Sequence, residues 1–134
     1  MPESEPWEYS LYIPNDPRAV TVGRRTLRLI LTVHNLIRLA DTAELLAAEL
    51  VGNAVRHTKG PAGLRVRWAV GVLRLGAWDT SPEPPEPPAW NPEAAAEEGR
   101  GLLLVQACAD EWGWHPLGSG ANRGKFVWCE LGAA

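Results

Sequence analysis

Two neighbouring rows of alternating residues constrain the fold of this chain most strongly. From Leu64 to Val70, apolar residues alternate with Arg or Ala, and from Leu73 to Asp79 a second alternating row ends in a carboxylate. Gly71, between the two rows, is expected to make the turn. Because side chains in a β-strand point alternately to the two faces of a sheet, the pattern predicts two strands that share one buried face. The buried row of the second strand would hold Leu73, Leu75, Ala77 and Asp79.

Two helices are predicted before this pair of strands. Asp16 can cap the first helix, which runs to about Val33. Asp41, followed three residues later by Glu44, predicts a capping box at the start of the second helix. That helix is expected to stop before Gly60, which is followed by a proline.

The remaining segments complete an alternation of strands and helices. Strands are expected at Trp7 to Ile13, Trp112 to Pro116 and Lys125 to Leu131, and a helix from Leu102 to about Asp110. The order predicts an α/β two-layer sandwich, with helices on one face of a mixed or antiparallel sheet. At 134 residues, the chain is expected to form one domain, residues 1–134.

Composition limits the class of protein. A hydrophobic content of 46% with seven Trp is enough for a real core. No apolar run approaches the roughly 18 to 20 residues that span a bilayer, and the first ten residues do not resemble a signal peptide, so a cytoplasmic protein is expected. Cys108 and Cys129 lie far apart in the sequence and are expected to be reduced core residues.

The charge pattern makes direct binding to nucleic acid improbable, because the net charge is −3. Positive charge nevertheless concentrates on the first predicted helix. Such a group either solvates a helix face or forms a docking surface for an acidic partner. The arginines concerned are Arg18, Arg24, Arg25 and Arg28.

Three polar residues recur every fourth position in the second predicted helix. Glu49, Asn53 and His57 therefore follow one face of an otherwise apolar helix. A carboxylate and an amide carbonyl one turn apart suit a hydrated Mg²⁺ and an attacking group near phosphates. The alternative is a surface row of polar residues on a core helix.

Three motifs in order resemble the GHKL (Bergerat-fold) ATPases, and most closely the anti-sigma-factor serine kinases and their actinobacterial relatives. ELVGNAVRH resembles the N box of that family, WDTSP its first glycine box and GRGLLLVQACADEWGW its second. The resemblance spans nearly the whole chain. It implies a Bergerat-type ATP-binding fold and the cofactors ATP and Mg²⁺.

The resemblance also implies roles for individual residues. Asp79 would accept a hydrogen bond from the adenine amine, Asn53 would hold Mg²⁺, and Glu49 would be the general base. His57 would belong to the ATP site or only cap the helix end, and residues 80–98 would form the ATP lid. The phosphates would be bound by Gly99, Arg100, Gly101 and Leu102.

The chain departs from the family pattern at two places. Ser81 and Pro82 follow Thr80 where the family has a glycine, and Phe126 stands where many relatives carry a threonine beside the adenine site. Both changes are expected to weaken nucleotide binding.

The leading function implied by the resemblance is an ATP-dependent serine/threonine kinase that phosphorylates an antagonist protein and sequesters a sigma factor. The alternative is a non-catalytic module of the same fold that acts by binding partners, with or without nucleotide. A homodimer is compatible with either function. A third hypothesis, the nucleotide domain of a sensor histidine kinase, is weakened because no phosphoacceptor helix precedes the domain.

Overall fold

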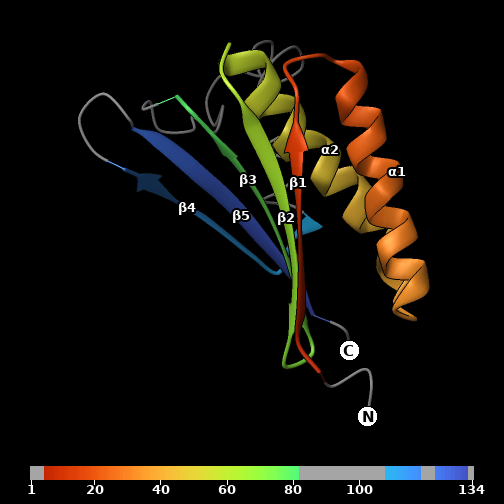
Figure 1. The fold of residues 1–134 in the computed structure, drawn as a ribbon. Helices are drawn as coiled ribbons and strands as arrows, with labels where there is room; N and C mark the ends of the chain where they lie inside the picture. Colours follow the sequence, from red (N-terminus) through yellow and green to blue (C-terminus); the bar gives the residue numbers. More distant parts are fainter. Residues whose placement is uncertain (1–4, 82–107, 119–122, 133–134) are drawn as a thin grey trace.

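The computed structural model describes residues 5–81, 108–118 and 123–132, with only the backbone of His57. These residues form an α+β arrangement in two layers, a sheet and the helices that cover one of its faces (Figure 1). The helices are α1 (Arg18–Val33), the short 3-10 helix η2 (Ile37–Leu39) and α2 (Ala40–His57). The strands are β1 (Trp7–Ile13), β2 (Ala62–Ala69), β3 (Val72–Asp79), β4 (Glu111–Leu117) and β5 (Gly124–Gly132).

The five strands form a sheet in the order β1-β2-β3-β5-β4, and all neighbouring strands are antiparallel. Of the two sheet types expected from the sequence, the antiparallel one is therefore correct. The register pairs Asp79 at the end of β3 with Ala62 of β2 on one side and with Lys125 of β5 on the other. Strands β3 and β5, separated in the sequence by 44 residues and strand β4, thus lie side by side.

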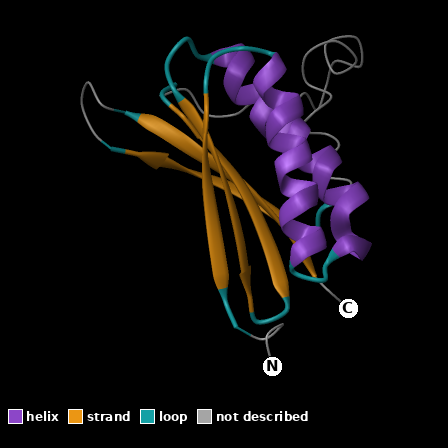
Figure 2. Ribbon diagram, turned by 45° about the vertical axis from the view of Figure 1, so that its right-hand side comes forward, coloured by secondary structure: helices purple, strands orange, loops and turns teal. Residues whose placement is uncertain are grey.

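The core lies between the sheet and the two α-helices, which stand together on one side of it (Figure 2). The predicted inward row of β3 is confirmed, since Leu73, Leu75 and Ala77 are buried. Helix α2 covers this row with an apolar face. The residues of that face include Ala43, Leu46, Ala47, Leu50, Val51 and Ala54.

The turn between β2 and β3 contains a left-handed backbone conformation at Val70 that the alternating pattern does not predict. Val70 was expected to continue the buried row of β2, but it lies in the turn and is 94% exposed. Both Val70, with φ 52°, and Gly71, with φ 75°, adopt left-handed conformations. Two residues with positive φ form the tight turn whose twist matches a hairpin, and a β-branched residue is strained there.

The start of α1 agrees with the expected role of Asp16. Its carboxylate accepts a hydrogen bond from the backbone N–H of Arg18 at 2.9 Å. The Arg18 side chain also binds this carboxylate, and these hydrogen bonds lower the pKa of Asp16 to about 2. Asp16 thereby satisfies one of the N–H groups that a helix start leaves without a partner.

The predicted capping box of α2 is wrong. The helix begins at Ala40, directly after η2, and its N-cap makes no side-chain hydrogen bond. Asp41 and Glu44 instead both bind Arg28 of α1, and Glu44 also lies 3.8 Å from Arg24. The carboxylates therefore join the two helices, because α1 offers them charged partners that are stronger than a backbone N–H.

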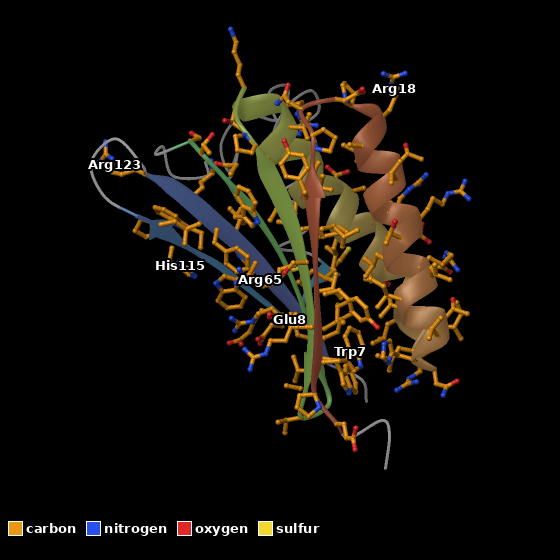
Figure 3. All side chains as sticks on the ribbon, viewed as in Figure 1. Trp7, Glu8, Arg18, Arg65, His115 and Arg123 are labelled. Atoms are coloured by element: carbon orange, nitrogen blue, oxygen red, sulfur yellow. The ribbon has the colours of Figure 1, made fainter. Side chains whose placement is uncertain are left out.

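Part of the outer face of the sheet is covered by aromatic side chains of the sheet itself. A Cβ atom on Gly76 would lie 2.0 Å from the Phe126 ring, and one on Gly63 would lie 2.0 Å from Trp78. Glycine lets these rings lie flat against the sheet. Phe126 is accordingly only 6% exposed, although its side chain points away from the helices, to the side where Figure 3 shows Arg65 and His115.

The two cysteines differ in environment. Cys129 is buried in β5, and its burial raises the pKa of the thiol to about 12. Cys108 is exposed, so the expectation that both belong to the core is wrong for Cys108, which follows the segment outside the described residues. Among the described helices, none combines the length and the apolar character needed to cross a membrane.

We expect Val70→Asn to stabilise the protein. The exposed Val70 side chain has few contacts to lose, and asparagine tolerates the left-handed conformation, so the free energy of unfolding should rise by about 1 kcal/mol. Urea unfolding measures the change. Val22→Asn on the exposed face of α1 is the matched control, expected to stay within about 0.5 kcal/mol of wild type. An unchanged midpoint for Val70→Asn would contradict the strain assigned to this turn.

Candidate functional site

The polar row of α2 lies on the flank of the helix that faces away from α1. Glu44 contacts Arg28 of α1, and Glu49 is about 140° further around the helix at 100° per residue. Glu49 and Asn53 are both partly exposed on this flank. At 1.5 Å per residue, Asn53 lies about 6 Å and Glu49 about 12 Å before the end of α2.

The end of α2 is joined to the end of β3. The hydroxyl groups of Thr58 and Thr80 lie 2.7 Å apart, and Thr58 also accepts a hydrogen bond from the N–H of Gly60. Asp79 directly precedes Thr80, so the carboxylate that ends the inward row of β3 lies beside the end of α2. The helix flank and this carboxylate are thereby held in one region of the molecule.

Asp79 is buried and bound to two groups of its own chain. Its carboxylate is 3.1 Å from the Lys125 ammonium through both oxygens, and Oδ1 also accepts from the N–H of Ser81 at 2.8 Å. Asp79 is 3% exposed and Lys125 is 7% exposed. Removing one partner of such a buried ion pair leaves an uncompensated charge in the core. This typically lowers the free energy of unfolding by about 3 to 5 kcal/mol.

Lys125 is the residue of this region that the sequence reasoning missed. Phe126, which the resemblance sets at the threonine position, points to the outer face of the sheet, whereas Asp79 lies on the face that carries the core. The residue of β5 that faces Asp79 is Lys125. The signal was present in the alternation of β5, because Val127, Cys129 and Leu131 are inward, which places Lys125 inward as well.

A second residue without an assigned role, Asn15, holds the end of α2 from the loop after β1. Its side-chain amide donates to the backbone carbonyl of Val55 at 3.2 Å and to that of Thr58 at 2.6 Å. Helix ends leave carbonyl groups without intrahelical partners, and Asn15 satisfies two of them.

The candidate residues on α2 have different partners. The Asn53 oxygen accepts from the Arg56 guanidinium at 2.9 Å in an exposed hydrogen bond. Glu49 has no hydrogen bond or ion pair with the described residues, so the alternative in which it merely pairs with Arg56 or an arginine of α1 is not what the structure shows. The His57 side chain, residues 82–98 of the expected lid, and Gly99, Arg100, Gly101 and Leu102 lie outside the described residues.

The described residues offer a partial fit to a magnesium nucleotide. Within residues 5–81, 108–118 and 123–132, no three His, Cys, Asp or Glu side chains gather at one point, so a metal there would need ligands beyond the chain, as Mg²⁺ bound to phosphates has. A metal ion could bind the side-chain oxygen of Asn53 after one exposed hydrogen bond, the one from Arg56, is broken. Asp79 retains acceptor capacity, because a carboxylate takes about four hydrogen bonds and the described residues donate two, both to Oδ1, while the Lys125 ammonium also lies 3.1 Å from Oδ2.

Comparison with known proteins adds no assignment. The chain matches no profile of a known protein family and no curated protein. Any function must therefore be argued from the residues themselves.

We expect Asn15→Ala to destabilise the protein and loosen the end of α2. Two carbonyl groups lose their donor, a partly buried one on Val55 and an exposed one on Thr58, which should cost about 1 to 3 kcal/mol in the free energy of unfolding. Asn53→Ala is the matched control and should cost less, because its hydrogen bond to Arg56 is exposed. Chemical denaturation measures both, and hydrogen exchange at residues 55–58 should accelerate only in Asn15→Ala. Equal stability of the two variants would contradict a stabilising role of the Asn15 hydrogen bonds at the end of α2.

Proposed function

We propose that this protein is an ATP-binding regulatory protein of the GHKL type that acts as a serine kinase on an antagonist protein and sequesters a sigma factor. The α+β two-layer arrangement is compatible with the Bergerat fold that this proposal requires. The observation that supports it most is the buried Asp79 carboxylate, held at the end of β3 beside the end of α2. A carboxylate that is held in place and can still accept a hydrogen bond is suited to bind the amino group of a nucleotide base.

Each residue in the proposal has a separate task. Asp79 accepts a hydrogen bond from the amino group of adenine, and Asn53 provides an oxygen ligand for Mg²⁺. Glu49 takes the proton of the incoming serine hydroxyl, and its carboxylate is suited to this task because it has no ion-pair partner among the described residues. Bound Mg-ATP would supply the phosphoryl group that is transferred.

A second candidate function is a non-catalytic interaction module of the same fold. Two observations favour it: Lys125 already neutralises Asp79, and Arg56 already occupies the oxygen of Asn53. In this case the protein binds its partners with or without nucleotide.

We expect Asp79→Asn to weaken the binding of Mg-ATP. The substitution replaces a charged acceptor by a neutral amide, and a hydrogen bond to a charged group contributes about 1.5 to 3 kcal/mol, roughly a tenfold to hundredfold change in affinity. Isothermal titration calorimetry measures it, with Asp41→Asn on the exposed start of α2 as the control. Equal affinities of wild type and Asp79→Asn would exclude Asp79 from base recognition.

We expect Glu49→Gln to retain nucleotide binding and to lose phosphoryl transfer. Glutamine keeps the size and polarity of the side chain but cannot accept the proton of a hydroxyl group. Transfer is followed with labelled ATP and candidate antagonist proteins, and Glu8→Gln on the exposed strand β1 is the control. If wild type transfers no phosphate to any of them but binds a sigma factor regardless of nucleotide, the interaction module replaces the kinase.

A further inference from the structure

The ion pair between Asp79 and Lys125 uses most of the hydrogen-bonding capacity of the carboxylate. The Lys125 ammonium lies 3.1 Å from each oxygen, and the N–H of Ser81 takes a further position on Oδ1. A carboxylate has about four acceptor positions, and among the described residues Oδ2 has no contact other than the Lys125 ammonium, so Oδ2 can still accept a hydrogen bond. A bound ligand can therefore donate one hydrogen bond to Asp79 while Lys125 stays in place.

Lys125 is held at this carboxylate by the sheet itself. It lies directly opposite Asp79 in the β3–β5 register and is almost as buried as its partner. Within the described part of the chain, Asp79 is the acidic group that Lys125 contacts. Every buried side-chain nitrogen and oxygen among these residues has a partner, so the described part of the region is satisfied without any ligand.

We propose that Lys125 competes with the bound ligand for Asp79, and that this lysine thereby sets the affinity of the site for a purine nucleotide. The inference rests on the proposed function, because it takes Asp79 as the residue that recognises the base. It assigns to Lys125 the role of a counter-charge that weakens the hydrogen bond from the ligand without occupying the ligand's position on Oδ2.

The physical reason is that one carboxylate serves two donors. An ammonium ion at 3.1 Å neutralises the charge that would strengthen a hydrogen bond from the ligand, and charge-assisted hydrogen bonds are roughly twice as strong as neutral ones. Without Lys125, the buried carboxylate lacks its counter-charge until a ligand donates to it. Lys125 therefore stabilises the ligand-free protein and weakens ligand binding, two effects of opposite sign.

The same geometry bears on the choice of base. Adenine presents a single amino group, which the remaining position on Oδ2 can accept. Guanine presents two adjacent N–H groups. A carboxylate binds both of them only when each of its two oxygens is available to accept a hydrogen bond. Lys125 should accordingly favour adenine, and its removal should reduce the preference.

The test compares Lys125→Met with wild type, with Lys59→Met as the matched control, since Lys59 is exposed and has no partner among the described residues. Two measurements are made: the thermal unfolding temperature without nucleotide, and the calorimetric affinity for Mg-ATP and Mg-GTP. We expect Lys125→Met to unfold at a lower temperature and to bind Mg-ATP about tenfold more tightly, the gain from one strengthened hydrogen bond. Its preference for Mg-ATP over Mg-GTP should fall, and Lys59→Met should match wild type throughout.

The outcomes separate the inference from the proposed function. If wild type binds Mg-ATP and Lys125→Met binds it equally or more weakly, Lys125 does not compete and the inference is wrong while the function stands. If neither wild type nor any variant binds a nucleotide, both are wrong. Binding by Lys125→Met alone would support the competition most directly.

A second variant protects the test from a failure to fold. Asp79→Asn combined with Lys125→Met removes both charges and leaves no unpaired ion. If Lys125 competes for the side chain at position 79, the double variant should bind Mg-ATP more tightly than Asp79→Asn alone. Equal affinities of these two variants would overturn the inference.

Discussion

Burial of one face of the sheet under α1 and α2 is the constraint on which the rest of the structure depends. The alternation of apolar residues along β2, β3 and β5 has to be in register across the sheet, because a slip by one residue would turn every inward side chain outward. The inward residues Leu64, Leu75 and Cys129 meet this requirement and are fully buried. On the outer face, the rings of Phe126 and Trp78 lie over glycine residues of the neighbouring strands.

The candidate site follows from the same constraint. The inward rows of β3 and β5 each end in a charged residue, and the register sets these residues opposite each other. Asp79 and Lys125 are thus drawn into the core side of the sheet together, and each compensates the burial of the other. A single charge at either position would have been unfavourable, since neither side chain reaches enough solvent to keep its hydration.

The neighbouring helix end is held by separate contacts. Asn15 binds two carbonyl groups at the end of α2, and Thr58 contacts Thr80 immediately after Asp79. These contacts fix the helix end relative to the strand end without using Glu49.

The sequence by itself determined the local elements and the inward rows. Strands β1, β3 and β5, helix α1 and the turn at Gly71 all follow from alternation, helical spacing and turn residues. The alternation of β5 also predicts that the Lys125 side chain points inward, toward the face that carries the core. These features are local, so a few neighbouring residues specify them.

Only the tertiary structure decided which residues meet. The partner of Asp79 lies 46 residues away, and no spacing rule reports that β3 and β5 are neighbours. Asp41 and Glu44 form ion pairs with Arg28 instead of the expected capping box, because α1 packs against α2. The hydrogen bonds from Asn15 to the end of α2 likewise join segments that lie about 40 residues apart in the sequence. Local periodicity encodes the direction of a side chain, but its partner depends on burial and charge compensation across the whole fold.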